Sequence, residues 1–216
     1  MHRSSISSVT ATTPLATSFP GRHWAPRLQL ELWHSWDCHH GMRVRAALSE
    51  KGIPFRSRAI GPGEKLDEFG GAAVVLMDRD ERKGASLPIL EYLDARWAEP
   101  PLFPARPGAE AIRTAMARVD DAFAPLHPRI ARGSPVERVL ALGAAQISMD
   151  ELDGEVAESG YLLGEFSAAD LVLASHVARL PPDWRPAQLG FRRLGRWERE
   201  VMSRPAVRDQ MASSAW

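Results

Sequence analysis

A change of pattern near residue 100 limits the folds available to this chain more than any other feature. Up to that point, strand-like alternation, as at Leu30 and Leu32, takes turns with the spacing of amphipathic helices. The stretch AEPPLFPARPG over residues 98–108 then places four prolines in eleven positions, which interrupts helix and sheet alike. Beyond it only helical spacing recurs. The pattern predicts an α/β domain over residues 28–97, a linker over 98–108, and an all-helical domain over 109–216.

The first domain is predicted to alternate strands with helices. Gly52 and Pro54 end a helix that begins just after Cys38, and Ser86 precedes a second helix with Pro88 in its first turn. The stretch ERKG before that second helix is a weaker, charged strand candidate. The clearer strands are expected over residues 28–33, 54–60 and 72–77.

The second domain is predicted to be a set of amphipathic helices. Apolar residues recur over 112–130, with a bend caused by proline near the end, and a second long helix runs from about Pro135 to Glu158. Ser167 and Asp170 form a capping box at the start of a further helix. The inner face of the second long helix is expected to hold Val136, Val139, Leu140, Gly143 and Ile147.

The composition indicates in which cellular compartment the protein works and which classes of partner it binds. The 216 residues carry 27 acidic and 27 basic side chains, so no net field gathers nucleic acid or an anionic membrane, and a small-molecule role fits better. The single cysteine excludes an internal disulfide and fits a reducing, cytoplasmic setting. No apolar run approaches the ~20 residues that span a bilayer. Residues 1–27, rich in Ser and Thr and free of acids, are predicted to be a disordered extension rather than a signal or transit peptide.

Four stretches, in order, resemble those of cytosolic glutathione transferases. CHHGMRVRAALSEKGIPF is similar to the first helix of that family and its exit, and SLPILEYLDARWAEPPLFP to the third helix and linker. GYLLGEFSAADLVLA resembles the capping motif of the sixth helix, and RWEREVMSRPAV the C-terminal helix. The resemblance implies a thioredoxin-like domain followed by an all-helical domain. It also implies glutathione as co-substrate, a small electrophile as the second substrate, and a homodimer.

The same resemblance assigns roles in a glutathione site. Cys38 precedes Arg43 with the C-x-x-x-x-R spacing of cysteine-type, omega-like members, so it is expected to be the catalytic thiol that activates or bonds to the glutathione sulfur. Ser86 matches the serine that holds the γ-glutamyl carboxylate at a helix N-terminus. Val74 stands where the family has a cis-proline, and with Val75 it is expected to meet the glutathione main chain. As a non-proline residue, Val74 should follow a trans peptide bond.

Neighbouring side chains provide further candidates. His39 and His40 follow the thiol, and either could stabilise a thiolate or move a proton near neutral pH; the alternative is a solvated helix start. Adjacent histidines on a helix point about 100° apart, so no metal site is predicted. Trp33 and Trp36, with Met116 of the helical half, are expected to line the site of the second substrate, although core packing explains the tryptophans equally well.

Simpler interpretations stay open for the thiol and for two arginines. Cys38 can instead be an inert thiol in a pocket wall, because a lone buried cysteine behaves as a small apolar residue. Arg43 and Arg45 are interpreted as surface residues of the first helix that pair with acids in the helical half. The alternative is that Arg43, with the amides at the helix start or a protonated histidine, lowers the pKa of the thiol.

Three functions are therefore compatible with the sequence. The first is a glutathione transferase-like enzyme in which Cys38 supports conjugation or, as the only cysteine, a monothiol exchange resolved by another glutathione. The second is a glutathione-independent isomerase, lyase or cyclase of a biosynthetic pathway, with the thiol as nucleophile and a histidine as acid or base. Val74 favours it, and so does Ala85, which stands where the family has an acidic residue. The third is a non-catalytic module that binds a ligand or a protein.

Overall fold

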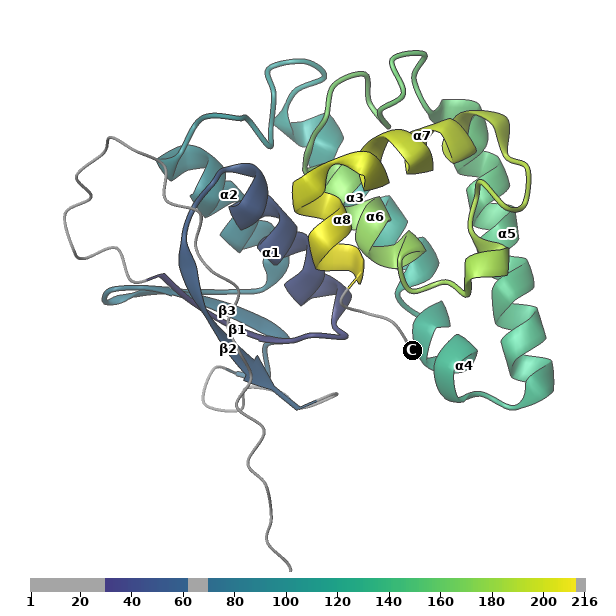
Figure 1. Cartoon of the computed structure of the whole chain (residues 1–216), viewed down its shortest axis with the longest axis horizontal. Helices are drawn as coiled ribbons and strands as arrows, with labels where there is room; N and C mark the ends of the chain where they lie inside the picture. Colours follow the sequence, from purple (N-terminus) through teal and green to yellow (C-terminus); the bar gives the residue numbers. More distant parts are fainter. Residues whose placement is uncertain (1–29, 62–69, 213–216) are drawn as a thin grey trace, which may run out of the picture.

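The computed structural model describes residues 30–61 and 70–212, which form a sheet layer beside a block of helices (Figure 1). The expectations for residues 1–27 and for Leu28 fall outside these ranges. The sheet contains β1 (Leu30–Ser35), β2 (Phe55–Ile60), β3 (Val74–Asp78) and β4 (Glu81–Gly84). β1 runs parallel to β2 and antiparallel to β3, and β3 is antiparallel to β4, which gives the order β2-β1-β3-β4. The charged stretch ERKG is thus a strand, as predicted, at one edge of the sheet.

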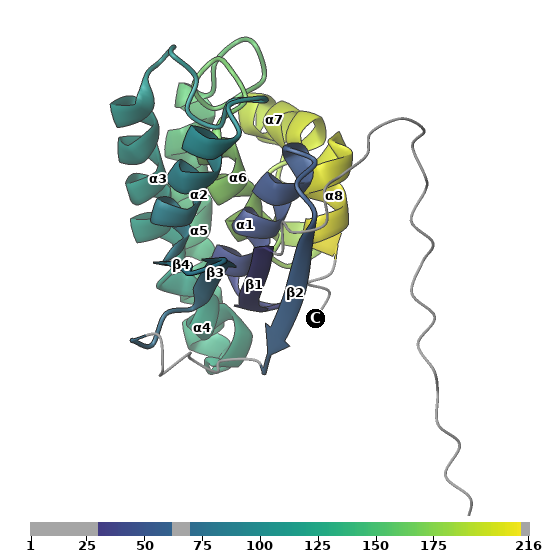
Figure 2. The same cartoon turned by 90° about the vertical axis from the view of Figure 1, so that its left-hand side faces the viewer.

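Two helices, α1 (His39–Glu50) and α2 (Ser86–Arg96), lie on one face of the sheet and pack against each other (Figures 1 and 2). Leu30 and Leu32 of β1 and Leu76 of β3 are almost completely buried and belong to the same apolar core as the inner faces of both helices. Each strand alternates its side chains between two faces, so every second residue reaches this core. The apolar layer therefore holds both helix starts against the sheet.

The remaining described elements are helices. They are α3 (Ala109–Phe123), α4 (Leu126–Arg132), α5 (Pro135–Glu155), α6 (Ala168–Val177), a short 3-10 helix (Pro182–Trp184), α7 (Arg192–Ser203) and α8 (Pro205–Met211). α6 is buried along its whole length, because α1, α3, α7 and α8 all pack on it. The predicted capping box of Ser167 and Asp170 starts this helix, and Asp170 also accepts a hydrogen bond from Trp197 Nε1 at 2.8 Å. No helix in the described ranges combines the length and apolarity that a bilayer crossing requires.

The helix predicted over 112–130 is two helices. α3 ends at Phe123 and α4 begins at Leu126, with Pro125 between them. The proline ring has no amide hydrogen and clashes with the carbonyl one turn earlier, so the expected bend is a break in the helix. α4 then places the ring of His127 against that of His176 in α6.

The inner face predicted for α5 is wrong. Four of the five residues assigned to it are its most exposed apolar side chains: Val136, Val139, Leu140 and Ile147, at 59–69% exposure. The buried face consists of Ala141, Leu142, Ala145, Met149 and Leu152. Both sets recur at helical spacing, and periodicity alone does not say which of two apolar stripes meets the core. We call Val136, Val139, Leu140 and Ile147 the outer α5 stripe.

Candidate functional site

Cys38 is the N-cap residue of α1 and directly follows the turn after β1. Gly41 lets the first helical turn approach the strand, because a Cβ there would lie 2.9 Å from the Ser35 carbonyl oxygen and 3.0 Å from His34 Cβ. The Cys38 backbone is extended, its thiol makes no capping hydrogen bond, and the residue is partly exposed. The thiol therefore lies at the positive end of the α1 dipole, where negative charge is favoured.

Two guanidinium groups, the buried one of Arg45 and the partly exposed one of Arg179, interact electrostatically with Cys38. The Arg45 guanidinium lies 4.3 Å from the centre of the Trp36 ring, and its Nη1 donates to His34 Nδ1 at 2.9 Å. Burial lowers the pKa of Arg45 to about 10, and Cys38 opposes that shift. Burial also lowers the pKa of Arg179, which follows α6, while interactions with Asp37 and Cys38 raise it. Both guanidinium groups thus lie within electrostatic range of the Cys38 side chain.

The structure corrects the interpretation of the two arginines of α1 as surface residues. Arg43 and Arg45 are both completely buried, because α6 and α8 of the helical half cover this side of α1. Arg43 does pair with an acid of the helical half, Asp120, as expected. Arg45 instead donates from Nε to Gln210 Oε1 at 3.0 Å and to His34. The charge of the two side chains predicted that they are exposed to solvent. In the structure each guanidinium instead forms hydrogen bonds with polar groups inside the protein.

Ser86 and Val74, both predicted to contact glutathione, lie at neighbouring starts of elements, since Val74 begins β3 and Ser86 begins α2. Ser86 is the first residue of α2, is nearly buried, and its Oγ is 3.0 Å from His40 Nδ1. The Ala85 amide donates to the Val74 carbonyl at 3.2 Å, and Ala85 has a φ of 64°, which is unusual for a residue with a side chain. The peptide bond before Val74 is trans, as predicted, and the side chains of Val74 and Val75 are buried. Burial lowers the pKa of His40 to about 4.

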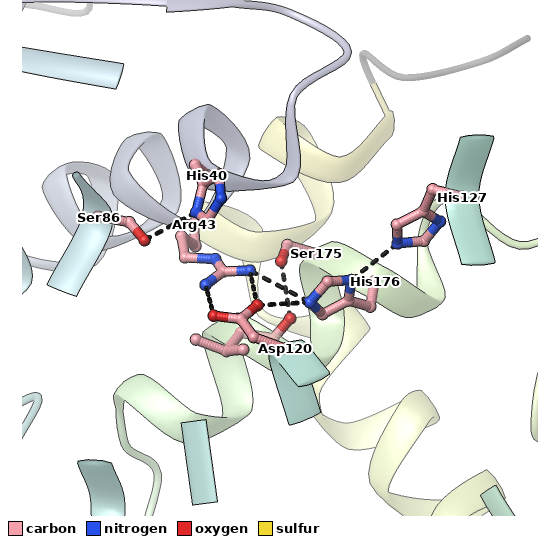
Figure 3. Close-up of polar contacts among 8 residues, drawn as sticks. His40, Arg43, Ser86, Asp120, His127, Ser175 and His176 are labelled. Carbon is pink, nitrogen blue, oxygen red and sulfur yellow. Dashed lines mark hydrogen bonds and ion pairs between the residues drawn. The ribbon is translucent and has the colours of Figure 1, made fainter. Parts of the chain in front are cut away.

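A second group of polar side chains lies where the sheet half meets the helical half, and Figure 3 shows most of it. We call His39, Arg43, Asp120, His127 and His176 the interdomain cluster. Arg43 of α1 donates to both carboxylate oxygens of Asp120 of α3, from Nη1 at 2.8 Å and from Nη2 at 2.7 Å. His176 Nε2 of α6 lies 2.7 Å from Asp120 Oδ1, and His176 Nδ1 lies 2.7 Å from His127 Nε2 of α4. The His39 ring is 4.7 Å from that of His176.

The histidines of the interdomain cluster are neutral at neutral pH. Burial lowers the pKa of His176 to about 4 and that of His127 to about 2, and it holds the pKa of His39 well below its usual range. Burial alone would raise the pKa of the Asp120 carboxyl, but hydrogen bonds from His176 and Arg43 outweigh burial and hold that pKa well below its usual range. The cluster thus combines an ionised carboxylate with neutral imidazoles.

The three residues predicted to contact the second substrate are dispersed. Trp36 is 42% exposed in the turn before the thiol, and Trp33 is half-buried on β1. Met116 is 3% exposed and belongs to the apolar core. A pocket of about 380 Å³ lies in the helical half, and none of the predicted site residues lines it. Its wall includes Thr114, Arg118, Glu155 and Leu162.

Sequence reasoning missed Asp120, His127, His176 and Arg179. A weak signal was present for two of them. Asp120 lies on the apolar stripe of α3, one turn after Met116, and His176 is the one ionisable base in the apolar stretch AADLVLASHV. An ionisable residue on a buried face usually has a specific partner, which makes it a candidate for a site. The identity of that partner depends on how the helices pack.

Comparisons with known proteins agree with this architecture. A family model described as the glutathione S-transferase N-terminal domain matches residues 32–101. The stringent starvation protein A homolog of Pasteurella multocida (strain Pm70) is 30% identical over 187 residues, which cover 82% of this chain and 84% of that protein. The stringent starvation protein A homolog of Histophilus somni is 30% identical over 173 residues, covering 77% of each.

Solved structures give the same result at the level of fold. Glutathione transferase Omega 3C from Trametes versicolor superimposes with a TM-score of 0.70 at 23% identity, covering 86% of this chain and 85% of that one. Rice GST1, solved in complex with glutathione, gives a TM-score of 0.74 at 22% identity, covering 86% and 91%. The predicted fold class, a thioredoxin-like unit followed by helices, is confirmed. The strand order, the two helix starts beside the sheet and these matches show that the chain belongs to the glutathione transferase superfamily, with the stringent starvation protein A homologs among its relatives.

Proposed function

We propose that the protein is a glutathione-dependent enzyme in which the Cys38 thiolate transfers thiols to and from a small electrophilic disulfide. The observation that carries the proposal is the convergence of two helix starts: Cys38 caps α1, Ser86 begins α2, and His40 bridges them at 3.0 Å. Helix N-termini attract anions, and glutathione brings a carboxylate and a sulfur that becomes anionic. One start would hold the γ-glutamyl carboxylate and the other would face the sulfur.

The polar groups at Ser86 support binding of a carboxylate. In the tautomer that carries its proton on Nδ1, His40 donates to Ser86 Oγ, so the hydroxyl hydrogen of Ser86 is free to donate to glutathione. Burial keeps His40 neutral at physiological pH, so it orients the hydroxyl without adding charge. The strained backbone at Ala85 sets the direction of the first turn of α2.

The exchange requires two balanced steps. The Cys38 thiolate attacks the glutathionyl sulfur of a mixed disulfide R–S–S–G; a sulfur–sulfur bond forms to Cys38 and the thiolate RS⁻ leaves. A glutathione thiolate then attacks the sulfur of Cys38-bound glutathione, which releases glutathione disulfide and restores the Cys38 thiolate. A chain with one cysteine needs this external thiol, because it has no second thiol to resolve the intermediate. In both steps the negative charge on the sulfur lies at the positive end of the α1 dipole, within electrostatic range of Arg45 and Arg179.

The proposal is tested by following the bond to Cys38. Incubation with glutathione disulfide should add one glutathionyl group per chain, seen as an increase in intact mass, and added glutathione should remove it. Cys38→Ser should abolish both the adduct and turnover while it retains glutathione binding. Ser86→Ala should weaken glutathione binding by about 10-fold or more, since a hydrogen bond to a carboxylate is lost. Ser203→Ala, at an exposed position, is the matched control. Full turnover in Cys38→Ser would show that the proposal is wrong.

A glutathione-free binding module is the second candidate. One observation favours it: Ala85 offers no carboxylate where the glutathione transferases have an acidic residue. In that case, glutathione neither binds in calorimetry nor reacts with Cys38, and a different ligand or a protein occupies the site.

We also propose that the protein forms a homodimer, as the family resemblance implies. The outer α5 stripe supports this proposal, since four large apolar side chains on one exposed helix face favour a covering partner. Sedimentation over a range of protein concentrations measures the assembly directly. A molecular mass equal to that of one chain at all concentrations contradicts the homodimer.

A further inference from the structure

The interdomain cluster contains a set of potential metal ligands that does not depend on glutathione. His39, Asp120 and His176 each offer one ligand atom, and these three atoms lie within 4.8 Å of one another. They come from α1, α3 and α6, so only the assembled fold brings them together. Two imidazoles and one carboxylate form a ligand set that suits zinc and other divalent transition metals. We propose that this cluster binds a divalent transition-metal ion of the zinc type.

The state of His39 supports the site. Its Nε2 is buried and has no hydrogen-bond partner, although the ring lies beside those of His176 and His127. A buried polar atom without a partner costs free energy, and an ion that binds there provides one. His40 points elsewhere, to Ser86, as expected for neighbours about 100° apart on a helix. The second and third ligands therefore come from other helices instead of the adjacent histidine.

His127 and Arg43 have the positions of groups that orient metal ligands. If His176 Nε2 binds the ion, its proton resides on Nδ1, where His127 Nε2 accepts it at 2.7 Å. The proton of His127 then resides on Nδ1, a buried atom with no other partner. Arg43 Nη1 holds Asp120 Oδ2 at 2.8 Å, while its Nη2 lies 2.7 Å from Oδ1 and 3.2 Å from His176 Nε2. An ion that binds Oδ1 and Nε2 must therefore displace Nη2 and can leave the bond from Nη1 in place. Binding thus needs a change of tautomer along the stacked rings and no net loss of a proton.

The three ligand atoms must rearrange locally to hold one ion. Ligand atoms around a tetrahedral zinc ion, with bonds of about 2.0–2.2 Å, lie roughly 3.5 Å apart. The three ligand atoms lie within 4.8 Å of one another, and His176 Nε2 and Asp120 Oδ1 are only 2.7 Å apart. Binding therefore widens that pair, and no hydrogen bond of His39 Nε2 opposes a movement of the His39 ring toward the ion. The Asp120 side chain is 29% exposed, so a water molecule or an anion can reach the open fourth position. An anionic fourth ligand also offsets the positive charge of Arg43.

The proposal is tested with the full-length, tag-free protein after treatment with a chelator and desalting. Titration with Zn²⁺ should reveal one site, and Co²⁺ at the same site should give visible absorption typical of nitrogen and oxygen ligands. The decisive variant is His39→Phe, which keeps an aromatic ring but has no ligand atom. It should bind Zn²⁺ at least ~10-fold more weakly and should lose the Co²⁺ spectrum. Zn²⁺ should raise the melting temperature of the unmodified protein and not that of the variant.

Two matched variants make the result specific. Cys38→Ser and His40→Phe should retain the site, since neither residue is a proposed ligand; weak binding by other histidines should be equal in all variants. Because His39 Nε2 makes no hydrogen bond, His39→Phe should fold, which circular dichroism without metal checks. If His39→Phe binds Zn²⁺ as tightly as the unmodified chain, or if Cys38→Ser abolishes the site, the proposed ligand set is wrong. Neither result depends on glutathione, so the two proposals can fail separately.

Discussion

At the scale of single residues, His34 shows how buried contacts fix a protonation state. Its Nδ1 faces Arg45 Nη1, which always donates, so the ring proton resides on Nε2 and is donated to Ser57 Oγ at 2.8 Å. Burial, with the nearby charge of Arg45, lowers the pKa of His34 from 6.5 to about 4. This histidine therefore stays neutral in the folded protein under conditions where it is protonated in the unfolded chain.

The sign of the resulting pH dependence follows directly. Between pH 6.5 and 4 the unfolded chain binds a proton at His34 that the folded protein does not, so the free energy of unfolding decreases as the pH falls. At pH 5 the loss from this residue is about 2 kcal/mol. His34→Gln keeps a donor and an acceptor but does not titrate. Denaturant unfolding at pH 7 and pH 5 should show a smaller loss in the variant, and equal losses would contradict the prediction.

The candidate site was predictable where local sequence determines geometry. The position of Cys38 as N-cap of α1 follows from a strand, a tight turn and Gly41, all within a few residues, and Ser86 begins α2 for similarly local reasons. The charges that surround the thiol were not predictable. Arg179, in the segment after α6, interacts with it electrostatically, and Arg45 is buried because α8 covers it. Such contacts depend on helix packing, which spacing in the sequence does not encode.

At the scale of elements, α5 carries two apolar faces of unequal importance. The buried face packs mainly on α4 and α7, whereas the outer α5 stripe contacts no other described part of the chain closely enough to be covered. Most other elements lie close to their predicted positions, because capping residues and prolines mark helix ends locally. α5 shows the limit of that method: periodicity identified the helix and not its orientation.

Paired substitutions on α5 separate the two faces. Leu142→Ala removes a buried side chain and should lower the free energy of unfolding by about 2–4 kcal/mol. Leu140→Ala, two residues earlier, should change it by less than about 0.5 kcal/mol in the monomer. Denaturant unfolding at low and high protein concentration makes the comparison. A loss for Leu140→Ala that appears only at high concentration indicates that a second chain covers the stripe, and equal losses at low concentration contradict the assignment of faces.

At the scale of the whole molecule, the sheet half and the helical half are joined by buried polar contacts as well as by apolar packing. Arg43 and Asp120 form a two-pronged ion pair across the boundary, and Arg204 of the α7–α8 junction forms another with Glu50 at the end of α1. A charge left in the interior without its partner is costly, so each pair penalises separation of the halves. The ion pair of Arg118 and Glu155 is exposed and carries no such penalty.

Removal of one partner at the boundary should therefore be costly. Asp120→Asn leaves the Arg43 charge buried without a counter-charge and should lower the free energy of unfolding by about 3 kcal/mol. Glu155→Gln, the matched control on the exposed pair, should cost less than about 1 kcal/mol. The double substitution Arg43→Met with Asp120→Leu should recover most of the loss, because both charges are then gone. Similar costs for Asp120→Asn and Glu155→Gln, measured by denaturant unfolding, would contradict this account.

The complete burial of α6 limits the substitutions that the chain can accept during evolution. α6 has no side that is exposed to solvent. Its ten residues must therefore pack against α1 of the sheet half and against α3, α7 and α8 of the helical half. A fragment that ends within residues 98–108 would expose to solvent the side of α1 that α6 covers in the full chain. We expect that exchange of one half between relatives, or production of one half alone, disrupts this shared contact.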